Sequence, residues 1–217
     1  MIRKMLVIAA AVAMPVSVVA ATAGTAGAGA PKVNATDYTV TCTGITAKAD
    51  FSPALTTAGG ASSNEKTSIS GKASGCTATP NGGGTPITVS GATLKGTINN
   101  ATSTHTCGGL TSPTTETGSL SIKWKTNPKL TDTTSVVNPT TVTGGVGADL
   151  HATFQLAFGT ATSGPFQGTD SGVSSSTNAE TTIGISAIET ACNGKGLKSV
   201  SIVANTNPGA GAAITAS

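Results

Sequence analysis

Short runs in which apolar and polar residues alternate recur along the chain, and they constrain its fold more than any other feature. Residues 119–126 show the pattern best, because Leu120, Ile122 and Trp124 alternate with Ser and Lys. A period of two residues is typical of a β-strand with one buried face. Similar runs lie at 37–46, 67–79, 87–98, 133–137, 140–146, 150–158, 181–188 and 197–204, with a short extended piece at 166–170.

Turn-forming residues separate these runs, most clearly in the segment 80–84, Pro-Asn-Gly-Gly-Gly. Thr and Val favour strands, whereas the residues that stabilise soluble helices are scarce. The sequence therefore predicts an all-β domain, either an antiparallel β-sandwich or a closed β-barrel of about nine or ten strands. We expect a long hairpin around 80–84 with a bulge at Gly91, irregular structure at 51–66, and at most one helical turn, at 187–191.

The first 28 residues have the composition of a secretory signal peptide. Two basic residues, Arg3 and Lys4, precede an apolar run, and small residues follow it up to Ala28. This order is typical of a signal that is cleaved during export. We expect cleavage after Ala28, with Ala23 as the second choice, and a mature chain in the extracellular space or the cell envelope. A retained membrane anchor is the alternative.

Composition divides the remainder of the chain into three parts. Residues 29–36 are predicted to be a flexible lead, residues 37–206 a single β-rich domain, and residues 207–217 a frayed tail of Gly, Ala and Pro. About 190 residues suffice for one domain with a real core and are few for two.

Four cysteines, at positions 42, 76, 107 and 192, follow the predicted signal peptide. An even number in an exported chain predicts two disulfides, for which three pairings are possible. We favour Cys76–Cys107, which closes a middle segment, together with Cys42–Cys192, which ties the first predicted strand to the last. A zinc site is the alternative, but the cysteines are scattered and no C-x-x-C motif is present.

The charge of the mature chain is close to zero. Residues 29–217 contain ten Lys, no Arg and nine acidic residues. Nucleic acids and anionic membranes are bound by clustered Lys and Arg, so neither is an expected partner. No apolar run after the signal is long enough to span a membrane as a helix. An extracellular glycan or another envelope component is the expected class of partner.

Candidate catalytic groups are few. The mature chain has two histidines, His105 and His151, and the second follows Asp149 by two residues. A serine hydrolase needs a nucleophile, a base and an orienting acid in contact, and no G-x-S-x-G motif is present. Two histidines are too few for a zinc or copper site, and no Asp-rich calcium loop occurs. We therefore assign no catalytic residue, metal ligand or cofactor, and expect both histidines to be partly exposed.

Trp124 is the lone tryptophan, and it has two interpretations. In a sugar-binding surface it would form an exposed ligand platform. Because it shares a strand face with Leu120 and Ile122, a core position is favoured. Lys123 and Lys125 would then face solvent, where Lys discourages association of strand edges.

Several short segments with a characteristic spacing are spread from the first predicted strand to near the last. They are 42–44 (Cys-Thr-Gly), 75–77 (Gly-Cys-Thr), 94–98 (Leu-Lys-Gly-Thr-Ile), 107–110 (Cys-Gly-Gly-Leu), 122–124 (Ile-Lys-Trp), 164–168 (Gly-Pro-Phe-Gln-Gly), and Cys192 with 196–198 (Gly-Leu-Lys). In this spacing the chain resembles a family of uncharacterised small secreted actinobacterial proteins with four cysteines. The resemblance implies an exported β protein with two disulfides, and it transfers no activity and no functional residue.

Three functions are weighed on these observations. A secreted or envelope-associated non-enzymatic β domain, acting as a structural or binding module, ranks first, because no reactive set of residues is evident. A secreted hydrolase or glycan-active enzyme ranks second, and it would require His105, His151 or two carboxylates in one cleft. An envelope β-barrel pore ranks last, because few aromatic residues are available for girdles.

Overall fold

The computed structural model describes nine stretches of the chain. They are residues 38–59, 65–80, 87–99, 105–113, 115–130, 132–158, 161–164, 178–205 and 214–216. The predicted signal peptide (1–28), the flexible lead (29–36), most of the predicted turn at 80–84 and the extended piece at 166–170 lie outside these residues.

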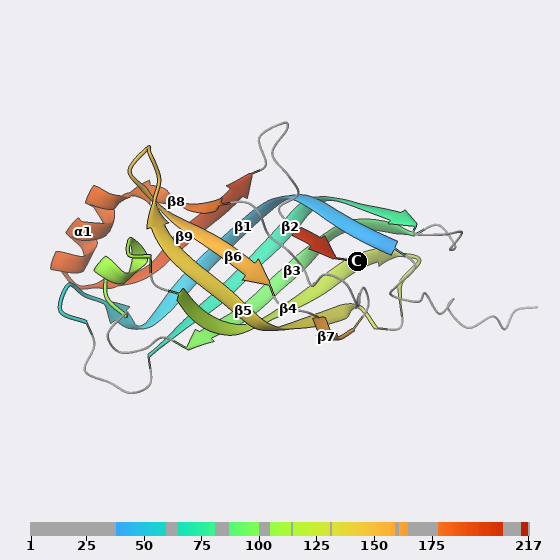
Figure 1. The fold of residues 1–217 in the computed structure, drawn as a ribbon, viewed down its shortest axis with the longest axis horizontal. Helices are drawn as coiled ribbons and strands as arrows, with labels where there is room; N and C mark the ends of the chain where they lie inside the picture. Colours follow the sequence, from blue (N-terminus) through green and yellow to red (C-terminus); the bar gives the residue numbers. More distant parts are fainter. Residues whose placement is uncertain are drawn as a thin grey trace, which may run out of the picture.

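The described strands form one antiparallel sheet that closes into a ring (Figure 1). Its eight longer strands are β1 (Tyr38–Leu55), β2 (Lys66–Pro80), β3 (Thr88–Asn99), β4 (Thr115–Asn127), β5 (Thr134–Val146), β6 (His151–Phe158), β8 (Asn178–Gly184) and β9 (Leu197–Asn205). They pair in that order, and β9 pairs with β1 to complete the ring. The prediction of an antiparallel all-β domain is confirmed. The sequence left open whether the strands stack as two sheets or close, and the hydrogen bonds join them in one ring-like sheet.

Two short strands extend this ring. β7 (Ala161–Ser163) pairs with β5, and β10 (Ile214–Ala216) pairs with β1 at Val40–Cys42. β1 is long enough to pair with β9 from Gly44 onwards and with β10 before that point. The prediction of a frayed tail over 207–217 is therefore wrong for Ile214–Ala216, because the free edge of β1 gives these residues backbone hydrogen-bond partners.

Most predicted strands are confirmed, including the long hairpin of β2 and β3. The predicted irregular segment 51–66 is wrong in its first part, because β1 continues to Leu55 and pairs there with Leu197. The two short strands predicted on either side of Asn138-Pro139 are one strand, β5, whose register with β4 shifts beside that dipeptide. The predicted strand 181–188 ends at Gly184, where helix α1 (Ile185–Asn193) begins. In α1 the core-facing residues are Ile188 and Cys192, four apart as a helix requires.

The residues that face the interior of the ring change parity at one level of the sheet. In β1 the buried series passes from Cys42 to Ile45, and in β3 it passes from Val89 to Ala92. The β3–β4 register shifts between Val89 and Gly91, which confirms the predicted bulge. One extra residue in a strand reverses which side chains point inwards, so these irregularities keep apolar side chains inside along the whole strand.

Trp124 lies in the core, as its alternation with Leu120 and Ile122 predicts. Its side chain is 2% exposed, and its indole Nε1 donates a hydrogen bond of 2.9 Å to Oγ of the buried Ser135. The alternative of an exposed ligand platform at Trp124 is therefore wrong. The partner on β5 satisfies the one polar group of the indole.

The favoured disulfide pairing is wrong. The bonds are Cys42–Cys76 and Cys107–Cys192, not Cys76–Cys107 and Cys42–Cys192. β1 and β2 form a hairpin whose register places Cys42 directly opposite Cys76. The hairpin was not predicted, because residues 51–66 were expected to be irregular. Residues equally distant from its centre are opposite each other, and the two cysteines are such a pair.

Candidate binding cavity

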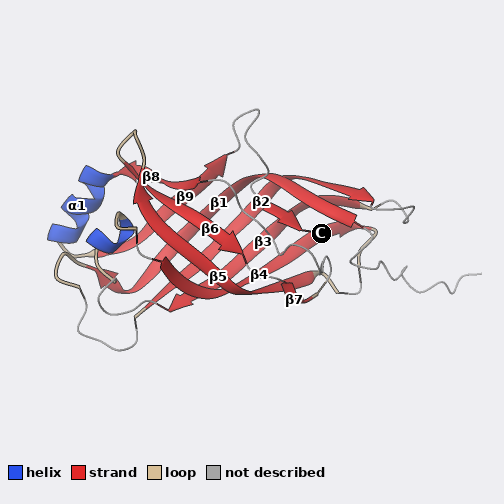
Figure 2. Cartoon of the chain, in the orientation of Figure 1, coloured by secondary structure: helices blue, strands red, loops and turns tan. Residues whose placement is uncertain are grey.

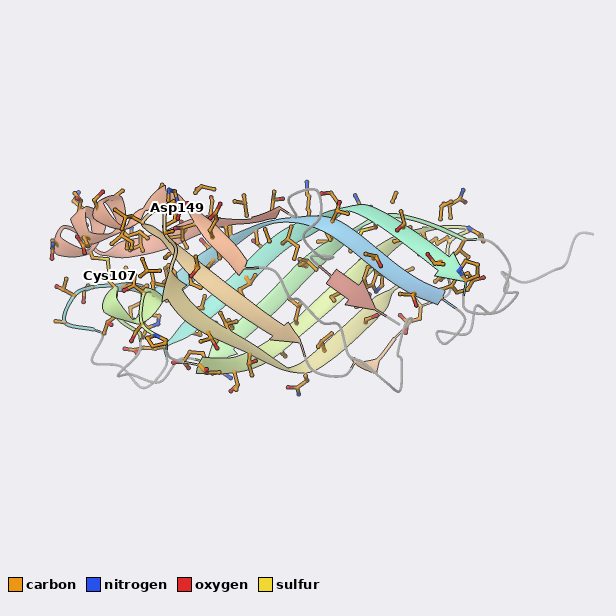
Figure 3. All side chains as sticks on the ribbon, turned by 45° about the horizontal axis from the view of Figure 1, so that its top comes forward. Cys107 and Asp149 are labelled. Atoms are coloured by element: carbon orange, nitrogen blue, oxygen red, sulfur yellow. A yellow bond between two sulfur atoms is a disulfide. The ribbon has the colours of Figure 1, made fainter. Side chains whose placement is uncertain are left out.

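Two segments cover the end of the ring at which β1 ends and β9 begins. One is residues 105–111, which include the short 3-10 helix Gly108–Leu110, and the other is α1. Figure 2 shows both helices together at this end, with strands along the remainder of the molecule. In Figure 3 Cys107 lies at the same end as Asp149, in the turn between β5 and β6. We call residues 105–111 the cap segment.

The cap segment crosses the end of the ring from β1 to β5. On the β1 side, His105 Nε2 lies 2.8 Å from the carbonyl oxygen of Pro53, and the backbone N–H of Cys107 donates to Thr56 O at 3.1 Å. On the β5 side, Gly144 faces the segment so closely that an added Cβ would lie 3.0 Å from Leu110 O. β1 and β5 are four strands apart in the ring of eight, so the segment spans opposite walls.

The disulfide Cys107–Cys192 joins the cap segment to α1. Its two cysteines are 85 residues apart in the sequence, and both are buried. In the chain-entropy account, closing a loop of this length lowers the entropy of the unfolded chain, which stabilises the folded state by about 4.5 kcal/mol at 25 °C. The two segments that cover this end are therefore held to each other as well as to the strands.

A cavity of about 100 Å³ lies beneath the cap segment. Most of its wall is apolar, and its polar side chains come from four residues. The wall consists of Ile45, Ala47, Ala49, Phe51, Leu55, Thr67, Ile69, Ile98, His105, Thr106, Gly109, Leu110, Glu116, Val142, Gly144, Phe154, Ala179 and Ile202. β1 contributes five of these residues. β2 and β5 contribute two each, and β3, β4, β6, β8 and β9 contribute one each.

Small residues leave this space open. Ala47 and Ala49 of β1, Gly144 of β5 and Ala179 of β8 occupy inward positions where larger side chains fill the ring elsewhere. Closed eight-stranded sheets have an interior just wide enough for side chains or for one small ligand. Here the short side chains at these four positions leave part of the interior unfilled.

His105 is the most deeply buried polar residue of this wall. It is 1% exposed, and its ring packs edge-on against Phe51 with centroids 6.3 Å apart. The carbonyl of Pro53 accepts a hydrogen bond from Nε2, so the neutral ring carries its proton there. Nδ1 is then an acceptor, and this buried atom has no hydrogen-bond partner. The expectation of a partly exposed His105 is wrong, because the cap segment turns inwards at this residue.

Two glutamates lie at the same end of the sheet, with different surroundings. Glu116 of β4 belongs to the cavity wall. Glu65, which precedes β2, is 4% exposed, and neither of its carboxylate oxygens has a hydrogen-bond partner. Neither glutamate was predicted as a site residue, since each acid is isolated in the sequence.

His151 is held by the backbone of β8 rather than by Asp149. Its Nδ1 donates to the carbonyl oxygen of Thr181 at 2.5 Å, while Asp149 Oδ1 accepts from the backbone N–H of His151 at 3.3 Å. The hydroxyl of Thr181 in turn donates to Ile183 O. Asp149 and His151 therefore stabilise the turn into β6 and do not form an acid–base pair. The expectation of a partly exposed histidine is confirmed at this position.

Within the described residues, no three His, Cys, Asp or Glu side chains form a group that could hold a metal ion. All four cysteines are in disulfides, so the alternative of a cysteine zinc site is wrong. No helix in the described part of the chain is long and apolar enough to cross a membrane. Two disulfides indicate folding in an oxidising environment, as in exported proteins.

A comparison of the chain with protein-family models, with curated proteins and with solved structures finds no match. The geometry of the cavity and of the sheet surface is therefore the basis for the function proposed below.

Proposed function

We propose that the chain is an exported, non-enzymatic binding domain that holds a small and mainly apolar molecule in the capped cavity. The observation that carries the proposal is His105, a residue of the largely apolar cavity wall whose buried Nδ1 has no hydrogen-bond partner. Ligand pockets combine apolar walls with a few placed polar groups that orient the ligand. Export is supported by the signal-like composition of residues 1–28 and by the two disulfides.

The polar group and the volume of the cavity limit which ligands fit. A neutral His105 that donates through Nε2 accepts through Nδ1, so the ligand needs a hydrogen-bond donor such as a hydroxyl group. A cavity of about 100 Å³ is smaller than the roughly 150 Å³ space that binds benzene in an engineered protein core. A short aliphatic alcohol, or the hydroxyl-bearing end of a longer molecule, matches both constraints.

The test is an NMR titration of the isotope-labelled mature chain with 1-butanol and with 1-chlorobutane, which lacks a donor. We expect saturable shifts confined to residues of the cavity wall, with the alcohol binding about tenfold more tightly. Such a difference corresponds to one hydrogen bond of about 1.4 kcal/mol. Equal binding of both compounds, or shifts spread evenly over the surface, would contradict the role of His105.

Three variants test the location of the site and the role of His105. Ala179→Leu fills the cavity from β8 and is expected to abolish binding, whereas Lys198→Gln, an exposed change on β9, is expected to leave binding unchanged. His105→Phe keeps a ring of similar size and removes the acceptor, so the preference for the alcohol is expected to disappear. A spectrum with native dispersion confirms that each variant is folded. Unchanged alcohol binding in folded Ala179→Leu would place the ligand elsewhere.

A further inference from the structure

The outer face of β1 to β4 carries a row of lysines, although the net charge of the mature chain is close to zero. Lys48, Lys72, Lys95 and Lys123 lie on four neighbouring strands, and all four are exposed. We call these four residues the lysine row. Lys125 and Lys66, which are also exposed, lie on the same outer face of β4 and β2.

Strand register brings the four residues of the row together. Lys48 is opposite Ser70, so Lys72 is its diagonal neighbour, and Lys72 is opposite Thr93, two residues before Lys95. Lys95 is opposite Ser121, which makes Lys123 the next diagonal neighbour. Diagonal neighbours in an antiparallel sheet are about 7–8 Å apart. The ammonium groups therefore follow one another across four strands.

Acidic residues do not balance this row. Within β1 to β4, Asp50 is the one acidic residue on the outer face, and it forms an ion pair with Lys48 at 2.5 Å. Glu116, the other acidic residue of these strands, faces the cavity. The other acidic residues that the structure describes, Glu65, Asp132, Asp149, Glu180 and Glu189, lie outside β1 to β4.

Protection of a sheet edge does not account for the row. Lys on a strand discourages association of free edges, and the sequence analysis gave Lys123 and Lys125 this role. At the level of the row, however, β1 pairs with β9 and β2, and β4 pairs with β3 and β5. None of these strands has a free edge there. Placing like charges at neighbouring sites opposes folding, which points to a role in binding.

We infer that the lysine row binds a linear phosphodiester polymer that carries no bases, such as a polyol-phosphate chain. Lys binds phosphate as a point charge, and it lacks the paired N–H donors with which the Arg guanidinium binds a carboxylate through two hydrogen bonds. Ser70, Thr93 and Ser121 are opposite Lys48, Lys72 and Lys95 in the sheet register, and hydroxyl side chains are ordinary phosphate ligands. Four regularly spaced cations match a chain of repeating anions better than a single one.

Two other polyanionic partners fit this face less well. Single-stranded nucleic acid is bound by aromatic side chains that stack on its bases, and the outer faces of β1 to β4 carry none in the described residues. An anionic membrane surface is bound most firmly where apolar side chains accompany the basic ones. Among the described residues, the exposed large apolar side chains are Val146 on β5, Leu150 in the turn before β6, and Ile183 on β8.

The experiment measures binding of the mature chain to poly(glycerol phosphate) by calorimetry at several salt concentrations. Four neutralised phosphates predict that log K falls with log salt at a slope of about −3, so affinity drops about fiftyfold between 50 and 200 mM salt. Poly-glutamate, a base-containing oligonucleotide and neutral dextran are the comparison ligands. We expect each of them to bind at least tenfold more weakly. Equal or tighter binding of poly-glutamate or the oligonucleotide would overturn the assignment to a base-free phosphodiester.

Two triple variants with the same change in net charge separate the row from total charge. The first combines Lys72→Gln, Lys95→Gln and Lys123→Gln, and the second combines Lys129→Gln, Lys195→Gln and Lys198→Gln, three exposed lysines outside the row. The first is expected to lose at least tenfold in affinity and to reduce the salt slope by about 2, while the second changes little. Equal effects of both would assign the binding to net charge and overturn the inference. This test does not depend on the cavity, so either proposal can fail alone.

Discussion

Cys107 of the cap segment and Cys192 of α1 form a disulfide that ties together the two segments covering one end of the ring. The other disulfide, Cys42–Cys76, links neighbouring strands whose hydrogen bonds already hold them in register. The two bonds therefore have different consequences for the cavity. One fixes its cover, and the other reinforces a hairpin of its wall.

Replacing Cys107 and Cys192 together by Ala is expected to loosen the cap segment. By loop length both disulfides have a comparable effect on global stability, about 4–4.5 kcal/mol, but only this change frees the cover. Hydrogen exchange followed by mass spectrometry measures the difference as faster exchange in residues 105–111. The matched control is the double change Cys42→Ala and Cys76→Ala, which leaves that segment tethered. Equal acceleration of exchange in both variants would show that the cap segment does not depend on its own disulfide.

The disulfide pairing can be read directly from peptides. Lysines separate the four cysteines, so trypsin places each cysteine in a different peptide. We expect a non-reduced digest to contain the peptide of Cys42 joined to that of Cys76, and the peptide of Cys107 joined to that of Cys192. The intact chain gains about four mass units on reduction, as two bridges require. Linkage of Cys76 to Cys107 would contradict the register of β1 and β2.

Gly144 is expected to tolerate no side chain, because the cap segment approaches it closely. A Cβ at this position would lie 2.7 Å from Ser112 O and 3.0 Å from Leu110 O, both backbone atoms. Gly144→Ala therefore displaces the segment, at a cost of about 1–3 kcal/mol in chemical unfolding.

Gly108→Ala is the control for this change. Gly108 belongs to the same segment, but its added Cβ meets no atom closer than Thr106 Oγ1 at 3.7 Å. We expect its free energy of unfolding to stay within about 0.5 kcal/mol of the parent, the usual range for surface substitutions. If the two variants are equally stable, the cap segment is not seated on β5.

Leu150 has a left-handed backbone conformation, with φ 61°, and its side chain is 67% exposed. This conformation costs a residue with a Cβ about 1–2 kcal/mol, and glycine avoids that cost while losing about 0.5–1 kcal/mol in chain entropy. Leu150→Gly is therefore expected to raise the free energy of unfolding by about 0.5–1 kcal/mol. Leu150→Ala, which shortens the side chain and keeps the Cβ, is the control and is expected to give no such gain. A destabilised Leu150→Gly would show that the exposed side chain makes a contact worth more than the strain.

The alternation of apolar and polar residues predicted a strand correctly wherever the pattern within that segment alone was unbroken. β4 is the clearest case: residues 119–126 alternate without interruption, and Trp124 is buried where the pattern places it. The same reasoning failed at the end of β1 and at the start of α1. At Phe51–Leu55 the strand is stabilised by partners in β2 and β9, and its own residues include a proline. At Ile185 the strand pattern continues in the sequence, yet packing of Ile188 and Cys192 favours a helix.

The sequence by itself determined that the chain is an antiparallel β protein with its cysteines available for two disulfides, because periodicity and composition act over a few residues at a time. Only the tertiary structure decided the disulfide pairing, the capped cavity with His105 in its wall, and the lysine row. Each of these depends on the register between strands, and on which segments cross the end of the ring. Register brings together residues such as Lys48 and Lys72, which are distant in the sequence and carry no mark of their proximity there.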